Sequence, residues 1–460
     1  FAFLANANAT PQLATFGLAA ILVGFMAIFF FLTPTALAST EMGAAWPRTG
    51  GLYVWTRLAF GEGAGFMIIW LEWANFVVAW PSIMGSLIIQ TAFLIDPALG
   101  SNTMFIVAVV ILVTWLGVAF ALRGLRATAK FAWYGVLAGT VIPSIAIVVM
   151  ASIYLIQGNP PAMEVSWGAL GSGFSSGNLA FISGSLLMFS GIEIAAIHAA
   201  DVRDPGRTIP RANFITVILC LVFLLPYILG IAAVIPSENI NLVTGVLQAA
   251  QSMFDTLNVS WLMPIFGVIF VTGFAATLIQ IINGPSRGLV VAGRQGGNLP
   301  PVLQKENSKH MPVNIIIVQG ILSSLLSLGY LFLGSIQNAW FMFALIQTNM
   351  VLVMYLIMFA ALVKLRRTQA STPRPYRIPG KKVGLAVVVG LGLLVCLFGI
   401  LVSFQPTDEA GAMSTWLYVA VLFLGTVAFI AMPFIFWIFR KPSWRTEIED
   451  VSVEDPEAVS

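Results

Sequence analysis

The sequence predicts an all-α protein that crosses a membrane many times. Of its 460 residues, 59% are hydrophobic and only 9% are charged, and the mean hydropathy is +0.94. A soluble domain carries about 25% charged residues. Apolar stretches of about 20 residues, the length of a transmembrane helix, recur along the whole chain.

Eleven such stretches are present, and each is interpreted as one membrane span. They cover residues 13–38, 65–95, 102–122, 132–156, 174–200, 212–235, 261–286, 313–334, 337–363, 383–404 and 414–439. A short apolar piece at residues 1–5 and a turn-like stretch at residues 6–11 precede them. Because the sequence opens on half a span, we expect a first helix whose start lies outside it, and twelve helices in the intact protein. Residues 1–440 are then a transmembrane domain, and the acidic segment 441–460 is a cytoplasmic tail predicted to be disordered.

The distribution of charge predicts an orientation. If the first helix starts in the cytoplasm, all 22 Lys and Arg residues fall on the cytoplasmic side. They lie near residues 39–64, 123–131, 201–211, 287–312 and 364–382 and in the tail from Arg440. The charged residues of the opposite loops are all Asp or Glu. This bias is typical of membrane proteins, places the C-terminus in the cytoplasm, and explains the net charge of +3 without a nucleic-acid partner.

Cysteine and histidine are scarce. Cys220 and Cys396 lie in separate spans, which favours neither a disulfide framework nor a metal site. His198 and His310 are too few and too far apart for a metal cluster, and we expect no cofactor. His198 is either a proton relay or a packed residue near the end of its span. With no nucleophile–base pair and no phosphate-binding loop in the sequence, an enzyme is not expected.

Glu193 is the residue most suggestive of a functional site. It lies deep in the apolar stretch 174–200, directly after Ser190-Gly191-Ile192. A carboxylate at that depth is costly and marks a substrate, ion or proton pathway. A helix interrupted near the membrane midplane is how secondary transporters build binding sites. The alternative is a structural role against a neighbouring helix. Glu72, a second intramembrane carboxylate, either lines the cytoplasmic path or bonds to another helix.

Four motifs resemble one family of transporters. Glu41 at a helix end, followed by Pro47-Arg48-Thr49-Gly50-Gly51 and an aromatic pair, is similar to the second-to-third helix junction of the amino acid–polyamine–organocation superfamily. Segments 204–211, 284–288 and 374–380 resemble its later loops, in family order. Glu41 and Arg48 form either a gate-side ion pair or interfacial charges that shape the loop.

Within this superfamily the sequence resembles the glutamate/γ-aminobutyrate antiporter group most closely. Segments 234–242 and 245–248 are similar to the extracellular stretch after its seventh helix. Ser190-Gly191-Ile192-Glu193 is similar to the Gly-Val-Glu of its broken sixth helix. Leu187 stands where arginine/agmatine exchangers carry a gating tryptophan. Thr277 departs from the group, since it stands where the eighth helix of the bacterial glutamate antiporter carries Glu.

The resemblance implies a twelve-helix transporter with a five-plus-five inverted repeat, in which helices 1 and 6 are discontinuous and helix 1 is incomplete in this chain. It implies that an amino acid binds at the two broken helices, with its ammonium group on carbonyls near the sixth-helix break. Phe189 would close over the substrate, Tyr355 would be a pocket tyrosine, and Glu193 would sense protons. Thr277 and Gln280 face either the pocket or a neighbouring helix. The expected substrate-binding residues are Leu187, Phe189, Ser190, Gly191, Ile192, Glu193, Thr277, Gln280 and Tyr355.

The expected function is therefore secondary active antiport in the plasma membrane, the inner membrane of a bacterium. The partners are a small amino acid and the lipid bilayer, and the expected exchange is glutamate for γ-aminobutyrate by alternating access. Three alternatives stay open: an exchanger of another amino acid and its decarboxylated amine, a proton-coupled importer, and a nutrient sensor that binds without transport. Sodium coupling also stays open, although no Lys in the fifth helix replaces a sodium ion.

Overall fold

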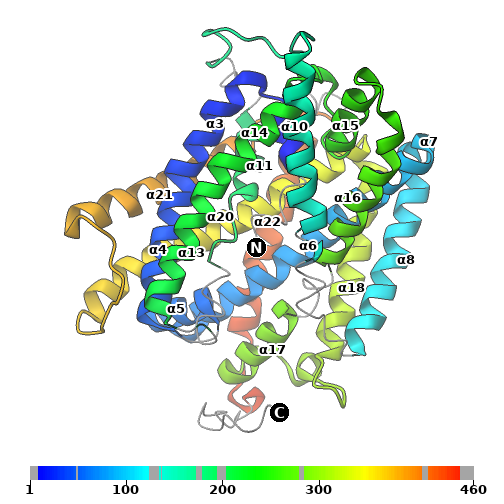
Figure 1. Cartoon of the computed structure of the whole chain (residues 1–460). Coiled ribbons are helices and arrows are strands. Elements are labelled where there is room, and N and C mark those ends of the chain that lie inside the picture. The colour runs from blue at the N-terminus through cyan, green and yellow to red at the C-terminus, as the bar shows by residue number, and fades with distance from the viewer. Residues whose placement is uncertain are drawn as a thin grey trace.

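The computed structural model describes residues 9–47, 50–123, 134–135, 137–171, 179–193, 202, 204–278, 284–406 and 413–445. This part of the chain is almost entirely helical (Figure 1). Its only β pairing is an isolated bridge between Glu306 and Pro312.

The first half of the chain contains twelve described helical segments. They are α2 (Thr10–Ala14), η2 (Gly17–Ala19), α3 (Ala20–Ala27), η3 (Ile28–Leu32), α4 (Thr33–Ala45), α5 (Gly51–Phe60), α6 (Glu62–Ile95), α7 (Pro97–Ser101), α8 (Thr103–Leu122), η4 (Leu137–Val141), α10 (Ile142–Ile156) and α11 (Leu179–Met188).

The second half continues in the same way. Its described segments are α13 (Pro205–Leu219), η8 (Cys220–Leu224), α14 (Leu225–Ala232), η9 (Ser237–Asn239), α15 (Gly245–Thr256), η10 (Ser260–Leu262), α16 (Met263–Leu278), α17 (Gly284–Gly296), η11 (Pro301–Gln304), α18 (Val313–Ser327), α19 (Gly329–Phe332), α20 (Ile336–Thr368), α21 (Lys381–Ser403), α22 (Thr415–Ile438) and η13 (Pro442–Trp444).

The predicted membrane-spanning architecture is confirmed. Within the described ranges, nine helical stretches are long and apolar enough to cross a bilayer. Of the shorter apolar helices, Leu179–Met188 lies inside the predicted span 174–200, and Ser260–Ala275 overlaps the predicted span 261–286. The count of twelve helices and the inverted repeat remain predictions.

The first predicted span was placed wrongly at both ends. Residues 10–14 form the separate helix α2, the chain turns at Gly17 with φ +54°, and the span then runs from Gly17 to Ala45. It continues beyond residue 38 because residues 39–45 contain no proline to stop it. The helix ends at Trp46, directly before Pro47, as expected for a residue that precedes proline. The predicted loop 39–64 is therefore largely helical.

Three spans share one irregularity, a π-helical turn followed at once by a proline. The π turns η3, η4 and η8 are followed by Pro34, Pro143 and Pro226, each in the first turn of the next α-helix. Proline lacks the N–H that an α-helix needs and clashes with the carbonyl four residues earlier. A wider turn accommodates that mismatch, so these spans cross the membrane as bent helices.

Two long helices form the centre of the molecule. Helices α6 and α20 contain 34 and 33 residues and pack against each other (Figure 1). A helix of that length extends about 50 Å, whereas the hydrocarbon core of a bilayer is about 30 Å thick. We infer that both helices lie obliquely in the membrane, where each contacts many other helices. In Figure 1, α7 and α15 lie at one end of the molecule, and α5 and α17 lie at the other.

Two glycines allow α16 to cross η4 with their backbones in contact. A Cβ atom on Gly273 would lie 2.0 Å from the backbone nitrogen of Gly139. A Cβ on Gly139 would lie 2.7 Å from the carbonyl carbon of Gly273. Small residues at crossing points are the usual means by which membrane helices approach closely.

We predict that Gly273→Ala destabilises the protein by about 1–3 kcal/mol, because α16 must move away from η4 to make room for the methyl group. Gly390→Ala on α21 is the matched control, since no atom lies within 4 Å of the added Cβ and alanine favours a helix. Thermal unfolding in one detergent measures both. Equal unfolding midpoints for the two variants would contradict the close crossing.

Candidate functional site

Helix α11 stops at Met188, and the chain turns sharply after it. The backbone N–H groups of Phe189 and Ser190 donate to the carbonyls of Leu186 and Leu187 at 3.0 and 3.1 Å. Gly191 then adopts φ +93°, a left-handed conformation that side chains with a Cβ rarely adopt. The predicted break in this helix therefore lies at Ser190-Gly191. The predicted break in helix 1 was assigned to no residue of this chain, and it remains a prediction.

The break places a buried carboxylate against a buried tyrosine. The Tyr355 hydroxyl, from the middle of α20, donates to Glu193 Oε2 and accepts the backbone N–H of Gly191 at 2.8 Å. Tyr355 is fully buried, and Glu193 is 8% exposed. The hydroxyl thus bonds both the acid and the backbone at the point where the helix stops. The sequence predicted both residues for the site, and the structure brings them into contact.

Apolar side chains enclose this contact. The ring of Phe31, from the π turn η3, lies 5.6 Å from the ring of Tyr355. Phe189 and Ile192 are buried, and Leu187 is partly buried. The carboxylate is therefore held in an environment of low polarity, where a charge interacts strongly with any group that reaches it.

Two of the predicted binding residues are not placed. Thr277 belongs to α16, but its side chain lies outside the described residues, as does Gln280 altogether. His198 also lies outside them. Their predicted roles remain predictions.

Glu72 is an acid close to Glu193. It lies on α6, partly buried, and the carboxylates of Glu72 and Glu193 are near enough to repel each other. The described part of the chain contains no ion pair to Glu72. The structure therefore relates Glu72 to the candidate site and gives no described partner for the alternative structural role.

Sequence reasoning missed Gln12 on α2, which packs against α11. Gln12 is fully buried, and among the described residues neither its amide oxygen nor its amide nitrogen has a hydrogen-bond partner. Its Nε2 atom lies 2.9 Å from where a Cβ on Gly184 would be. A buried amide without partners is costly, and such groups are often satisfied by a water or a ligand. In the sequence, Gln12 is one polar residue after Pro11, and that alone does not identify it as a candidate site residue.

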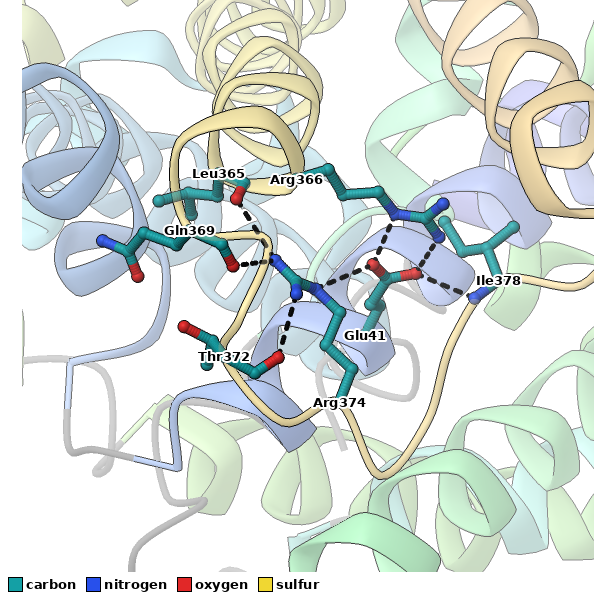
Figure 2. A network of polar contacts seen from close by, with 7 residues as sticks. All are labelled: Glu41, Leu365, Arg366, Gln369, Thr372, Arg374 and Ile378. Atoms are coloured by element: carbon teal, nitrogen blue, oxygen red, sulfur yellow. Dashed lines mark hydrogen bonds and ion pairs between the residues drawn. The ribbon is translucent and has the colours of Figure 1, made fainter.

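Glu41 lies at a second buried ionic cluster, near the end of α4. Its carboxylate accepts hydrogen bonds from Arg366 Nε at 2.7 Å and from a second Arg366 nitrogen, and from the backbone N–H of Ile378 at 2.8 Å (Figure 2). Arg374 Nε lies 3.6 Å from Glu41 Oε1. Glu41 is fully buried, and the two arginine side chains are 8% and 9% exposed.

The predicted partner of Glu41 was Arg48, which lies outside the described residues. The acid instead joins α4 to the end of α20 and to the loop before α21. Arg374 completes this connection, since it donates to the carbonyls of Leu365, Gln369 and Thr372 (Figure 2). Burial lowers the pKa of Arg374, and the charge of Glu41 opposes that shift. Arg366 was hidden in the sequence within a run of basic residues.

Comparison with known proteins identifies the family. The sequence profile of the amino acid permeases matches residues 2–429. The chain belongs to the amino acid permease family. This result confirms the predicted superfamily and shows that the protein is a transporter and not an enzyme.

Relatives of this permease span nearly its whole length. It is 31% identical to an uncharacterised transporter of Legionella pneumophila over 443 residues, which cover 95% of this chain and 94% of that protein. It is 29% identical to a glutamate/γ-aminobutyrate antiporter of Lactococcus lactis, with 96% and 88% covered. It is 23% identical to a probable agmatine/putrescine antiporter of the same species, with 89% and 86% covered.

A solved structure supports the fold alone. The manganese transporter of Eremococcus coleocola, in complex with an aromatic bis-isothiourea substituted compound, superposes with a TM-score of 0.53 at 14% identity. The match covers 95% of this chain and 93% of that one. The permease therefore shares the arrangement of helices of that transporter along most of its length.

We predict that Glu41→Gln destabilises the permease by about 3–5 kcal/mol, because Arg366 and Arg374 then lose the buried charge that compensates them. Glu62→Gln is the matched control. Glu62 is 38% exposed and pairs with Arg57 and Arg445, an arrangement that contributes about 0–1 kcal/mol. Thermal unfolding in detergent distinguishes the two variants, and equal losses of stability would show that the Glu41 cluster is no more important than a surface ion pair.

Proposed function

We propose that this permease is a secondary active antiporter that exchanges glutamate for γ-aminobutyrate by alternating access. The observation that carries the proposal is the buried contact between Glu193 and Tyr355 at the break of α11. A buried carboxylate on an interrupted helix is the arrangement that secondary transporters use at substrate sites. The similarity to the glutamate/γ-aminobutyrate antiporter along 96% of the chain supports the choice of substrates.

The break offers complementary groups to an amino acid. The carbonyls at the end of α11 carry partial negative charge, and Glu193 adds a full charge when it is ionised. A substrate ammonium group is attracted to both. Tyr355 donates one hydrogen bond to Glu193, and a substrate that approaches can compete for it. The substrate-binding residues in this proposal are those predicted from the sequence, with Thr277 and Gln280 from the eighth helix among them.

Glu193 is proposed as the proton sensor of the exchange. Transfer of a carboxylate from water to an apolar environment disfavours the charged form. Protonation removes the charge that attracts the substrate ammonium, so the affinity of the site changes with pH.

A second candidate is exchange of another amino acid for its decarboxylated amine. By the resemblance drawn from the sequence, Thr277 stands where a carboxylate is expected in the eighth helix, which would alter the charge that a substrate meets. The probable agmatine/putrescine antiporter, at 23% identity over 89% of this chain, supports this candidate.

The proposed topology follows the charge bias. The end of the molecule with α5 and α17 faces the cytoplasm of a bacterium, and the end with α7 and α15 faces outward. Residues 1–440 form the transport domain, and residues 441–460 form a cytoplasmic tail.

Counterflow in proteoliposomes tests the exchange. We expect uptake of labelled glutamate that requires γ-aminobutyrate inside the vesicles. Uptake into empty vesicles driven by a pH gradient would indicate an importer instead. Binding without any flux would indicate a sensor. A requirement for agmatine or another internal amine would favour the second candidate.

A substitution of Glu193 tests its role as the sensor. Glu193→Gln keeps the size of the side chain and an acceptor for Tyr355 but cannot ionise, so we expect the pH dependence of exchange to flatten. Glu62→Gln, on the exposed start of α6, should leave the pH profile as in the wild type. An unchanged profile in Glu193→Gln would rule out this residue as the sensor.

A further inference from the structure

A cavity of about 650 Å³ lies at the end of the molecule opposite the basic loops. Its walls come from the end of α6, from α7, from the segment that joins η9 to α15, and from the start of α20. In Figure 1 these elements meet at the upper right. The volume is in the range of sites that bind small molecules. The cavity is separate from Glu193 and Tyr355, neither of which lines it.

The lining is mainly polar, which argues against a lipid tail as the occupant. Ile89 and Phe93 form part of the apolar wall. Six side chains supply amide or carboxylate groups: Glu238, Asn239, Asn241, Gln248, Gln337 and Asn338.

Hydrogen bonds hold these walls in place. Gln248 accepts from the backbone N–H of Asn241 at 3.1 Å and donates to the carbonyl of Asn239 at 2.9 Å. Gln337 accepts from the backbone N–H of Leu242 at 3.1 Å, which ties the start of α20 to the same loop. The cavity is therefore preformed, and a ligand need not order it.

Glu238 is the acid of the cavity, and it is available for a ligand. Three other acids at this end accept hydrogen bonds from within the protein: Asp96 from the N–H of Ala98, Glu164 from Ser166, and Asp255 from Ser260. Glu238 is exposed and forms no hydrogen bond or ion pair with the part of the chain that the structure describes. Every described Lys and Arg lies in the segments at the opposite end.

We propose that this cavity is a second, low-affinity site for a small ligand with a primary ammonium group. Glu238 supplies the opposite charge, and the side-chain amide oxygens of Asn239 and Asn338, which accept no hydrogen bond from the described residues, supply further acceptors. Since no described Lys or Arg lies at this end, no described cation of the protein competes with the ligand ammonium for the Glu238 carboxylate. An ammonium group is common to amino acids and amines, so the site would collect substrate before it reaches Glu193. That last step rests on the proposed function, whereas the binding itself does not.

The test uses the full chain in lipid nanodiscs and n-butylamine as the probe, with saturation-transfer NMR to measure binding. We expect Glu238→Gln to weaken the apparent affinity by about 1.5- to 5-fold, the effect of one exposed ion pair. Glu164→Gln is the matched control, because it removes the same charge from the same end without lining the cavity. It should leave the affinity unchanged.

Three results would overturn the proposal: no effect of Glu238→Gln, equal weakening by Glu164→Gln, and complete loss of the butylamine signal in Glu193→Gln. The last result would assign all butylamine binding to the candidate site at Glu193 and Tyr355. Because Glu238 is exposed and has no described partner, its substitution should leave thermal unfolding unchanged. Failure of glutamate counterflow would refute the proposed function, while the difference between Glu238→Gln and Glu164→Gln would still decide this site.

Discussion

The structure depends on hydrogen bonds from α20 to two buried carboxylates, those of Glu193 and Glu41. Glu193 is bonded by Tyr355 in the middle of this helix, and Glu41 by Arg366 near its end. A buried charge without a partner is costly, so each acid fixes a neighbouring element against α20. One of these elements is the break after α11, and the other is the end of α4. The long central helix therefore holds the candidate substrate site and the ionic cluster in one rigid frame.

The two contacts differ in a way that suits different roles. Glu41 meets two arginines and a backbone N–H, so its charge is compensated by fixed groups of the protein. Glu193 meets one neutral hydroxyl and backbone N–H groups, and no described arginine or lysine pairs with it. Its charge is only partly compensated, which leaves it responsive to a proton or to an ammonium group. The same chemical group thus stabilises the fold at one position and is poised for binding at the other.

Much of this architecture could be predicted from the sequence because lipid imposes simple rules. Spans of sufficient length and low charge identified the helices, and Gly191 and Glu193 identified the break. The sequence did not reveal where α4 ends, since a helix can continue into the interface until a proline stops it. It also did not reveal that Arg366 reaches Glu41 across 325 residues, because pairs of distant residues leave no periodic pattern. Gln12 was missed because a single polar residue beside a proline does not by itself indicate a buried site.

The most direct measurement of the central claim is an experimental structure of the permease in a lipid nanodisc with a bound amino acid. The account predicts density for the ligand beside Gly191 and Glu193, with its ammonium group toward the end of α11 and Tyr355 within hydrogen-bond distance. Density at another place, with the contact between Tyr355 and Glu193 unchanged and closed to the ligand, would contradict it.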